Sequence, residues 1–185
     1  MLLDRARING PMDRASAGDP DAFGAVACEA QDELFRLALA NGLSRDDAAE
    51  ATQEALMRAY AGRAGWRRGA DAMAWLCGIL LNVVREFHRR RRQQRMTLAA
   101  AGGHGAGLPY QPAAGGRPWD PEALGPLMEA IQRLPPRQRE AVACRYLRQM
   151  SIRRTAEAMG CAEGTVKSAV SAALERLRGI LQELP

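Results

Sequence analysis

Four hydrogen-bonding side chains near the C-terminus have the spacing of groups on one face of a helix. A short helix that begins at Ser151 is predicted to end at Gly160, and a second predicted helix follows it closely. A helix, a Gly-containing turn of about three to four residues and a second helix form a helix-turn-helix, whose second helix enters the DNA major groove. The outward side chains of that helix would be Thr165, Lys167, Ser168 and Ser171. The pattern predicts a DNA-binding module in which these groups contact phosphates and base edges.

The apolar residues around the turn support this interpretation. Ala156 is small enough for the two helices to approach closely, and Val166 and Val170 would fill the joint between them. The alternative is an ordinary pair of packed helices in a helical bundle.

A second surface lies on the helix predicted from Ser44 to about Tyr60. Alanines form its buried stripe, and its other side carries Glu50, Gln53, Glu54 and Met57. Carboxylate and amide groups on one side of a helix suit a basic, Arg-bearing protein partner. The alternative is a solvated polar face without a partner.

Charge is distributed unevenly along the chain. Residues 1–65 contain seven Arg and eleven acidic residues, whereas residues 66–95 contain eight Arg and two acidic residues. Residues 121–185 contain ten basic and seven acidic residues, and the net charge of the whole chain is +5. An acidic front and two basic blocks indicate a protein partner for the first part and nucleic acid for the others. Solvated helix faces would explain the charges alone equally well.

Composition and periodicity predict an all-α protein of two small helical domains joined by a flexible linker. Only 5% of the residues are aromatic, and the abundant Ala, Leu and Arg favour helix. Apolar residues recur at helical spacing within 19–95 and again within 120–185, which are the two predicted domains. Residues 96–119 are rich in Gly, Ala and Pro, as linkers are. Residues 1–18 are an N-terminal extension that fits no motif.

Local signals place several helix ends. Asp19-Pro20, Ser44 and Asp120-Pro121 resemble helix starts, and another helix is expected to begin near Asp71. A further helix from Arg137 to about Arg148 would bury Val142, Tyr146 and Leu147.

No arrangement of residues suggests catalysis or metal binding. The four cysteines form no C-x-x-C pair, and His88 and His104 lie in a basic helix and a Gly-rich segment. We therefore expect reduced thiols, no metal, no cofactor and no enzymatic activity. Because no apolar run has the length of a membrane span and the start lacks a signal-peptide core, we expect a soluble, intracellular protein.

The C-terminal part resembles the domain of bacterial sigma factors that reads the promoter −35 element, in particular that of the compact extracytoplasmic-function (ECF) group of the sigma-70 family. The resemblance rests on Leu134-Pro135-Pro136, Ser151-Ile152-Arg153-Arg154-Thr155-Ala156 and Gly160-Cys161-Ala162-Glu163-Gly164-Thr165-Val166-Lys167-Ser168.

Residues 19–95 resemble the first domain of the same group. Asp21-Ala22-Phe23 is similar to its opening, and Gln53-Glu54 and Arg58-Ala59-Tyr60 are similar to the helix that binds the polymerase clamp. The helix that engages the −10 element is matched by Ala74-Trp75-Leu76, Asn82, Arg85-Glu86 and Arg89-Arg90.

The resemblance implies an alternative sigma factor, which is a non-enzymatic subunit that brings core RNA polymerase to chosen promoters. Residues 19–95 would dock the polymerase and melt the −10 element, and residues 120–185 would contact −35. The implied partners are promoter DNA and core polymerase, through its β′ clamp helices and β subunit, in the bacterial cytoplasm and on the nucleoid. The sequence leaves open whether an anti-sigma factor restrains the protein.

Promoter melting gives the basic residues after Gly65 a role under this resemblance. A base that leaves the stack must be held in a pocket, and Trp66, Arg67 and Arg68 supply an aromatic ring and cations for it. On the next helix, the side chains expected to contact −10 DNA are Asn82, Arg85, His88, Arg89 and Arg90. Core packing is the alternative for Trp66 and the favoured interpretation for Trp75. A solvated helix end is the alternative for residues 89–92.

Departures from the family pattern predict weak −35 discrimination. Arg154 stands where the family usually has Glu, and Ala169 stands where it usually has Arg. Bidentate contacts from Arg to guanine, worth roughly 1–3 kcal/mol each, are therefore scarce on the second helix. Phosphate affinity would come from Arg145, Arg148, Arg153 and Arg154.

Two other classes of protein compete with this interpretation. A stand-alone helix-turn-helix regulator would never dock polymerase, so it would tolerate substitution of Glu50, Gln53 and Glu54. An enzyme acting on nucleic acid would use the basic helices to hold its substrate, but the chain lacks clustered carboxylates that could hold Mg²⁺.

Overall fold

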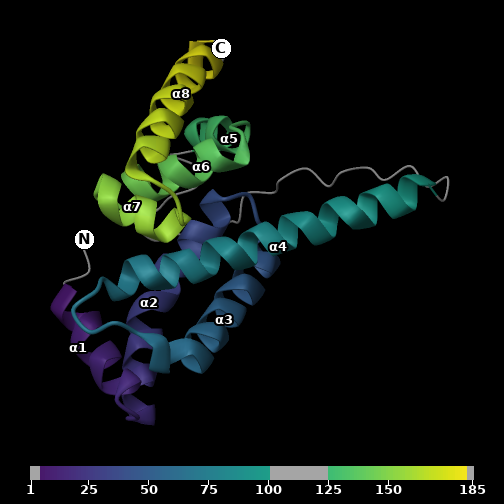
Figure 1. Cartoon of the computed structure of the whole chain (residues 1–185). Coiled ribbons are helices and arrows are strands. Elements are labelled where there is room, and N and C mark those ends of the chain that lie inside the picture. The colour runs from purple at the N-terminus through teal and green to yellow at the C-terminus, as the bar shows by residue number, and fades with distance from the viewer. Residues whose placement is uncertain (1–4, 101–124, 183–185) are drawn as a thin grey trace.

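The computed structural model describes residues 5–100 and 125–182, and all the regular structure in these ranges is helical (Figure 1). The helices are α1 (Arg5–Ser16), α2 (Pro20–Ala40), α3 (Arg45–Gly62), α4 (Ala72–Ala100), α5 (Gly125–Gln132), α6 (Pro136–Val142), α7 (Ile152–Met159) and α8 (Glu163–Gln182). A 3₁₀ turn, Arg63–Gly65, follows α3, and a π-helical segment, Ala143–Leu147, continues α6. The all-α prediction is confirmed.

The N-terminal half consists of α1 to α4, and α2 and α3 begin at the predicted caps. The Asp19 carboxylate accepts the backbone N–H groups of Asp21 and Ala22 at 3.1 and 3.2 Å. The Ser44 hydroxyl accepts the N–H of Asp47 at 3.3 Å. These side chains satisfy N–H groups that have no partner within the first turn of a helix, which fixes where α2 and α3 begin.

The predicted N-terminal extension contains a helix. Within α1, Ile8, Met12 and Ala15 are at most 2% exposed and belong to the hydrophobic core. The helix packs against α2, α4 and the 3₁₀ turn. Residues 5–16 are therefore part of the N-terminal half, although no motif marked them.

The fourth helix is longer than expected. The predicted linker began at residue 96, but α4 continues to Ala100. Met96 and Leu98 are 64% and 54% exposed, so this end of α4 lies away from the core. The run from Met96 to Ala100 consists mostly of good helix formers, which explains the extension without tertiary contacts. The rest of the predicted linker, and the predicted cap at Asp120-Pro121, lie outside the described residues.

The C-terminal half contains the predicted helix-turn-helix in α7 and α8. Ser151 caps α7 by accepting the N–H of Arg154 at 3.2 Å, and Gly160 ends it with the left-handed angles φ 64° and ψ 43°. Val166 is fully buried between the helices and Val170 is half-buried. One expectation was wrong: Tyr146 is 50% exposed, because the π-helical segment turns the residues after Val142 away from a regular helical register.

The two halves pack against each other through α4 and α7. Figure 1 shows α4 running between α2 and α3 on one side and the C-terminal helices on the other. Gly78 of α4 faces the backbone of Ala158, where a Cβ atom would lie 3.1 Å from the carbonyl oxygen. A single core cluster contains buried residues from both halves. We call this the closed arrangement.

Candidate nucleic-acid and protein interfaces

A groove of about 1180 Å³ lies between α4 with its preceding loop and α7. It brings together side chains that the sequence assigned to two separate surfaces. The loop and α4 contribute Trp66, Arg67, Asn82 and Arg85, and α7 contributes Arg153 and Arg154. We call it the interdomain groove.

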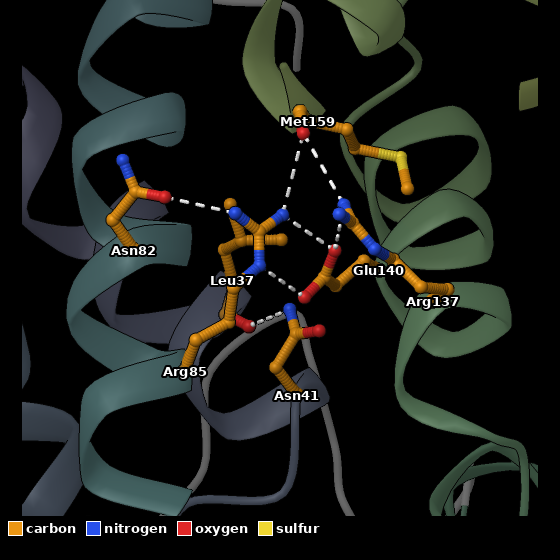
Figure 2. A network of polar contacts seen from close by, with 7 residues as sticks. All are labelled: Leu37, Asn41, Asn82, Arg85, Arg137, Glu140 and Met159. Atoms are coloured by element: carbon orange, nitrogen blue, oxygen red, sulfur yellow. Dashed lines mark hydrogen bonds and ion pairs between the residues drawn. The ribbon is translucent and has the colours of Figure 1, made fainter. Parts of the chain in front are cut away.

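Arg85 forms the central contact across this groove. Its Nε and Nη2 atoms donate to the two carboxylate oxygens of Glu140 on α6, at 2.8 and 2.7 Å (Figure 2). The Glu140 side chain is 5% exposed, and Arg137 lies 3.5 Å from the same carboxylate. The hydrogen bonds to Glu140 raise the pKa of Arg85 above its ordinary value, so the guanidinium stays charged. A bidentate pair of this kind fixes both the distance and the orientation of α4 relative to α6.

The carbonyl oxygen of Met159 extends this contact to the end of α7. Arg85 and Arg137 both donate to it, at 3.5 and 3.3 Å, which satisfies an acceptor that the end of a helix leaves free. Arg85 also donates to the Asn82 side-chain oxygen at 2.8 Å. The structure thus gives Arg85 protein partners at the positions where DNA was expected.

Two more arginines predicted to contact DNA are engaged between the halves. Arg154 lies 2.8 Å from the carboxylate of Asp71, just before α4. Arg148, whose side chain is 13% exposed, pairs with Glu33 of α2. Arg153 differs, because its side chain is 80% exposed and pairs along its own helix, with Glu157 at 3.1 Å.

His88 is also held by protein groups. Its Nε2 atom lies 2.9 Å from the carbonyl oxygen of Asn41, which also accepts from Arg139 at 3.0 Å. Burial lowers the pKa of His88 below its ordinary value, and nearby Arg139 and Arg91 act in the same direction. A neutral imidazole that donates to this carbonyl is consistent with the lowered pKa.

The burial of the two tryptophans is the reverse of what the sequence predicted, because Trp66 is buried and Trp75 is partly exposed. Trp66 is 7% exposed, and its indole N–H donates to the carboxylate of Asp13 at 2.7 Å. Trp75 is only half-buried, and its ring centroid lies 5.6 Å from that of Trp66. The aromatic face open to the groove therefore belongs more to Trp75. Sequence reasoning missed Asp13 because it precedes every motif.

The remaining cations predicted to bind −10 DNA are on the surface. Arg67, Arg68, Arg89 and Arg90 are exposed. Arg90 lies 3.9 Å from Glu86 and over the ring of Phe87. These groups can reach a nucleic-acid backbone without any change in the protein.

The second helix of the helix-turn-helix presents its predicted side chains to solvent. Thr165, Lys167, Ser168 and Ser171 are all exposed. The Ser168 hydroxyl donates to the carbonyl of Gly164 at 3.0 Å, one turn earlier on the same helix. Lys167 is the one cation among the four.

The predicted protein-binding side of α3 borders a hollow, which Gln53 and Met57 help to line. Glu50, Gln53 and Met57 are exposed, with Met57 at 60%, and Glu54 is half-buried. An apolar hollow of about 640 Å³ lies between α2 and α3 and is lined by Phe23, Phe35, Leu56, Met57 and Tyr60. Sequence reasoning did not single out Phe35, which comes from α2 and reaches this surface only in the folded protein.

A charge network supports one edge of this side. Arg58 donates to Glu54 at 2.8 Å and to both carboxylate oxygens of Glu86 on α4, each at 2.8 Å. These bonds raise the pKa of Arg58 and lower that of Glu86. The network fixes α3 against α4. The side chains predicted to bind polymerase on α3 and those predicted to bind −10 DNA on α4 therefore belong to one rigid unit.

Two further observations concern metal binding and membrane-spanning helices. Within residues 5–100 and 125–182, no group of three or more His, Cys, Asp or Glu side chains is placed to hold a metal ion. Every helix in this part of the chain is too short or too polar to cross a membrane.

Comparison with known proteins identifies both halves. Residues 29–94 match the family described as Sigma-70 region 2, and residues 124–177 match Sigma-70, region 4. The chain is 32% identical over 165 residues to the ECF RNA polymerase sigma factor SigM of Mycobacterium tuberculosis, covering 89% of this chain and 80% of that protein. It is 30% identical over 186 residues to the ECF RNA polymerase sigma factor BldN of Streptomyces coelicolor, covering 97% and 68% of the two chains.

Solved structures agree in fold. The sigma factor RpoE of Bartonella quintana, crystallised with the anti-sigma factor NepR, has a TM-score of 0.65 and 28% identity, covering 84% of this chain and 93% of that one. CnrH, solved with the cytosolic domain of CnrY, has a TM-score of 0.70 at 20% identity and shows the fold alone.

The protein belongs to the ECF group of RNA polymerase sigma factors. It is an alternative sigma factor that binds core RNA polymerase and directs transcription initiation at promoters. Sigma factors are non-catalytic initiation factors, and the stand-alone regulator is the less favoured alternative.

Proposed function

We propose that the two halves divide promoter recognition between them. In this proposal, the α3 side formed by Glu50, Gln53, Glu54 and Met57 docks the β′ clamp helices. The loop before α4 and the basic face of α4 hold the melted −10 element, and α8 contacts −35. The domain boundaries expected from sequence are carried into this proposal, with α1 added to the first domain. The protein works in the cytoplasm, where polymerase joins it to the nucleoid.

The observation that carries this proposal is the clustering of exposed cations and the half-buried Trp75 along one edge of α4. Arg67 and Arg68 precede the helix, and Arg89 and Arg90 lie further along it. Aromatic rings and cations along one path are what single-stranded DNA requires, because every base has a stacking face and every nucleotide has a phosphate. The rigid network from Arg58 to Glu86 connects this path to the polymerase-docking side.

The closed arrangement implies that promoter binding requires the halves to separate. Arg85 bonds to Glu140 and Met159, and Arg154 pairs with Asp71, so a DNA strand along this face of α4 would displace α7. A conformational change of this kind needs a partner that binds the open state more tightly than the closed one. Core polymerase, which would hold each half at its own site, can supply that difference.

An anti-sigma factor is a further proposed partner. The solved RpoE structure is a complex with the anti-sigma factor NepR. A protein that binds the closed arrangement of this chain would keep Arg85 and Arg154 from DNA without contacting either residue.

The experiment that tests the proposed function is run-off transcription with purified chain and purified core polymerase, with the start sites mapped on genomic DNA. We expect start sites preceded by a shared −10 sequence that core polymerase alone does not use. The proposal is overturned if the chain binds DNA but adds no start sites to those of core polymerase. Glu50→Arg and Gln53→Arg should abolish the new starts, whereas a stand-alone regulator would retain its DNA binding and its effect.

A further inference from the structure

The loop that carries Arg67 and Arg68 is attached at both ends to α1. At its start, the Trp66 indole N–H donates to Asp13 at 2.7 Å. At its end, the backbone N–H of Ala72, the first residue of α4, donates to the side-chain oxygen of Asn9 at 3.0 Å. Asn9 and Asp13 are four residues apart on α1, so they lie on the same face of that helix.

Both attachments satisfy groups that would otherwise be left without a partner. Trp66 is 7% exposed, and a buried indole N–H requires an acceptor. A carboxylate acceptor makes this bond stronger than one between neutral groups. The N–H of Ala72 belongs to the first turn of α4, where no helical carbonyl is available. Loss of either side chain on α1 would therefore release one end of the loop.

The segment between the attachments is short and exposed. Arg67, Arg68, Gly69 and Ala70 are all solvent-exposed. The Ala70 N–H donates to the Arg67 carbonyl at 3.1 Å, and Gly69 has a φ of 81°, so the segment is a tight turn. The two arginines thus project from a turn whose ends are both fixed to α1.

We propose that Asn9 and Asp13 are positioning residues for capture of the melted −10 strand, acting through the Trp66–Asp71 loop. A loop that is already ordered loses less conformational entropy when it binds DNA, so the attachments raise affinity for the strand without contacting it. This inference rests on the proposed function, because it needs the loop to bind the −10 strand. It gives α1, which precedes both matched family regions, a specific part in promoter opening.

The test uses holoenzyme assembled from the full chain and core polymerase, and a promoter mapped by run-off transcription. Three quantities are measured: affinity for a fork DNA whose −10 non-template strand is single-stranded, affinity for an upstream duplex that carries only −35, and affinity of the chain for core. The variants are Asp13→Ala, Asp13→Asn, Asn9→Ala and Asn9→Asp. Asp13→Asn and Asn9→Asp keep an oxygen that can accept the bond.

We expect Asp13→Ala to weaken fork binding about tenfold, as loss of a hydrogen bond to a charged group does, and Asn9→Ala to weaken it severalfold. Duplex and core affinity should stay within about twofold, and the two acceptor-retaining variants should recover most of the fork binding. Glu29→Ala is the matched control, because Glu29 lies 4.0 Å from Arg7 of α1 but does not touch the loop. It should leave all three affinities unchanged.

The outcomes separate this inference from the proposed function. If wild-type holoenzyme opens the promoter but both alanine variants bind the fork as tightly as wild type, the positioning role is overturned and the proposed function stands. Equal loss of all three affinities in variants that fold like wild type would also overturn it, because the effect would not be specific to the melted strand. Should Asp13→Ala fail to fold, Asn9→Ala decides by the same criteria. If wild-type holoenzyme does not prefer the fork to the duplex, both proposals fail.

Discussion

Arg85 and Glu140, which lie 55 positions apart in the chain, form a bidentate ion pair with N–O distances of 2.8 and 2.7 Å. Arg85 is a residue expected to face −10 DNA, and Glu140 belongs to the half proposed to contact −35. The pair holds the two surfaces proposed to bind the promoter against one another. It therefore links the stability of the closed arrangement to the availability of the DNA-binding residues.

Removing Glu140 should favour the open arrangement. Glu140→Ala deletes both bonds to Arg85 and leaves Arg137 without its carboxylate, which should shift the balance between closed and open forms roughly tenfold or more. Small-angle X-ray scattering of the free chain should show a larger radius of gyration. Glu157→Ala is the control, because its pair with Arg153 is exposed and contributes little. An unchanged radius for Glu140→Ala would show that this pair does not hold the halves together.

A larger side chain at Gly78 should have the same effect by steric means. A Cβ atom there would lie 3.1 Å from the Ala158 carbonyl oxygen, so the rest of a leucine side chain cannot fit unless α4 and α7 move apart. Gly78→Leu should increase both the radius of gyration and the hydrodynamic radius of the free chain. Gly24→Leu is matched in chemistry and has open space at its Cβ, so it should change neither property. Equal compactness of the two variants would argue against tight packing of α4 on α7.

Reversing charge on α3 should weaken polymerase binding. Glu50→Arg or Gln53→Arg places a cation opposite a surface expected to be basic, and like charges across an interface cost several kcal/mol, so core affinity should fall by roughly tenfold or more. Fluorescence anisotropy of the labelled chain with core polymerase measures this. Glu175→Arg, on the exposed side of α8, makes the same charge change as Glu50→Arg away from the predicted docking side and should have little effect. If Glu50→Arg and Gln53→Arg bind core polymerase as tightly as Glu175→Arg does, the docking surface lies elsewhere.

Acidification should destabilise the closed protein through His88. Burial lowers its folded-state pKa below the ordinary value of 6.5. Above pH 6.5 the folded and unfolded states both hold a neutral imidazole, and the stabilising contribution is complete. As the pH falls below 6.5, His88 is protonated in the unfolded state before it is protonated in the folded state. The free energy of unfolding therefore decreases until the pH has passed the folded-state pKa of His88. Urea titrations on both sides of pH 6.5 should show that the free energy of unfolding falls more steeply on acidification for wild type than for His88→Gln. Parallel pH dependences of the two proteins would contradict this.

The −35 element should contribute little to promoter choice. Lys167 is the one cation among the four outward residues of α8 predicted to contact DNA. Scrambling −35 should lower holoenzyme binding less than about tenfold, whereas scrambling −10 should abolish opening. A loss of several hundredfold on scrambling −35 would mean that α8 makes base contacts that its side-chain types do not suggest.

The local features of the fold could be predicted from the sequence. Ser151 and Gly160 mark the ends of α7 because capping and left-handed turns depend on residues within one turn of the helix. The predicted stripe of Ala48, Ala51, Ala55, Leu56 and Ala59 followed from helical periodicity. The four alanines are buried and Leu56 is half-buried. The outward positions on α8 followed from the same periodicity.

The contacts between distant segments could not be predicted. Periodicity could not decide which tryptophan is buried, because Trp66 lies in a loop and its acceptor, Asp13, is 53 positions away. The pairing of Arg85 with Glu140 depends on how two halves pack, and the motif around Arg85 indicates DNA binding whether or not that pairing exists. Tyr146 was misplaced because no local signal announced the π-helical segment.

The central claim is that the DNA-binding surfaces are closed in the free chain and separate on polymerase. It is tested most directly by the distance between spin labels on the two halves, measured by pulsed electron paramagnetic resonance. Labels at Cys28, which is exposed on α2, and at Glu175→Cys on α8 report this distance, with Cys161 replaced by Ser. We predict one short distance for the free chain and a longer one after core polymerase is added. The same distance in both states, or a long one in the free chain, would contradict the account.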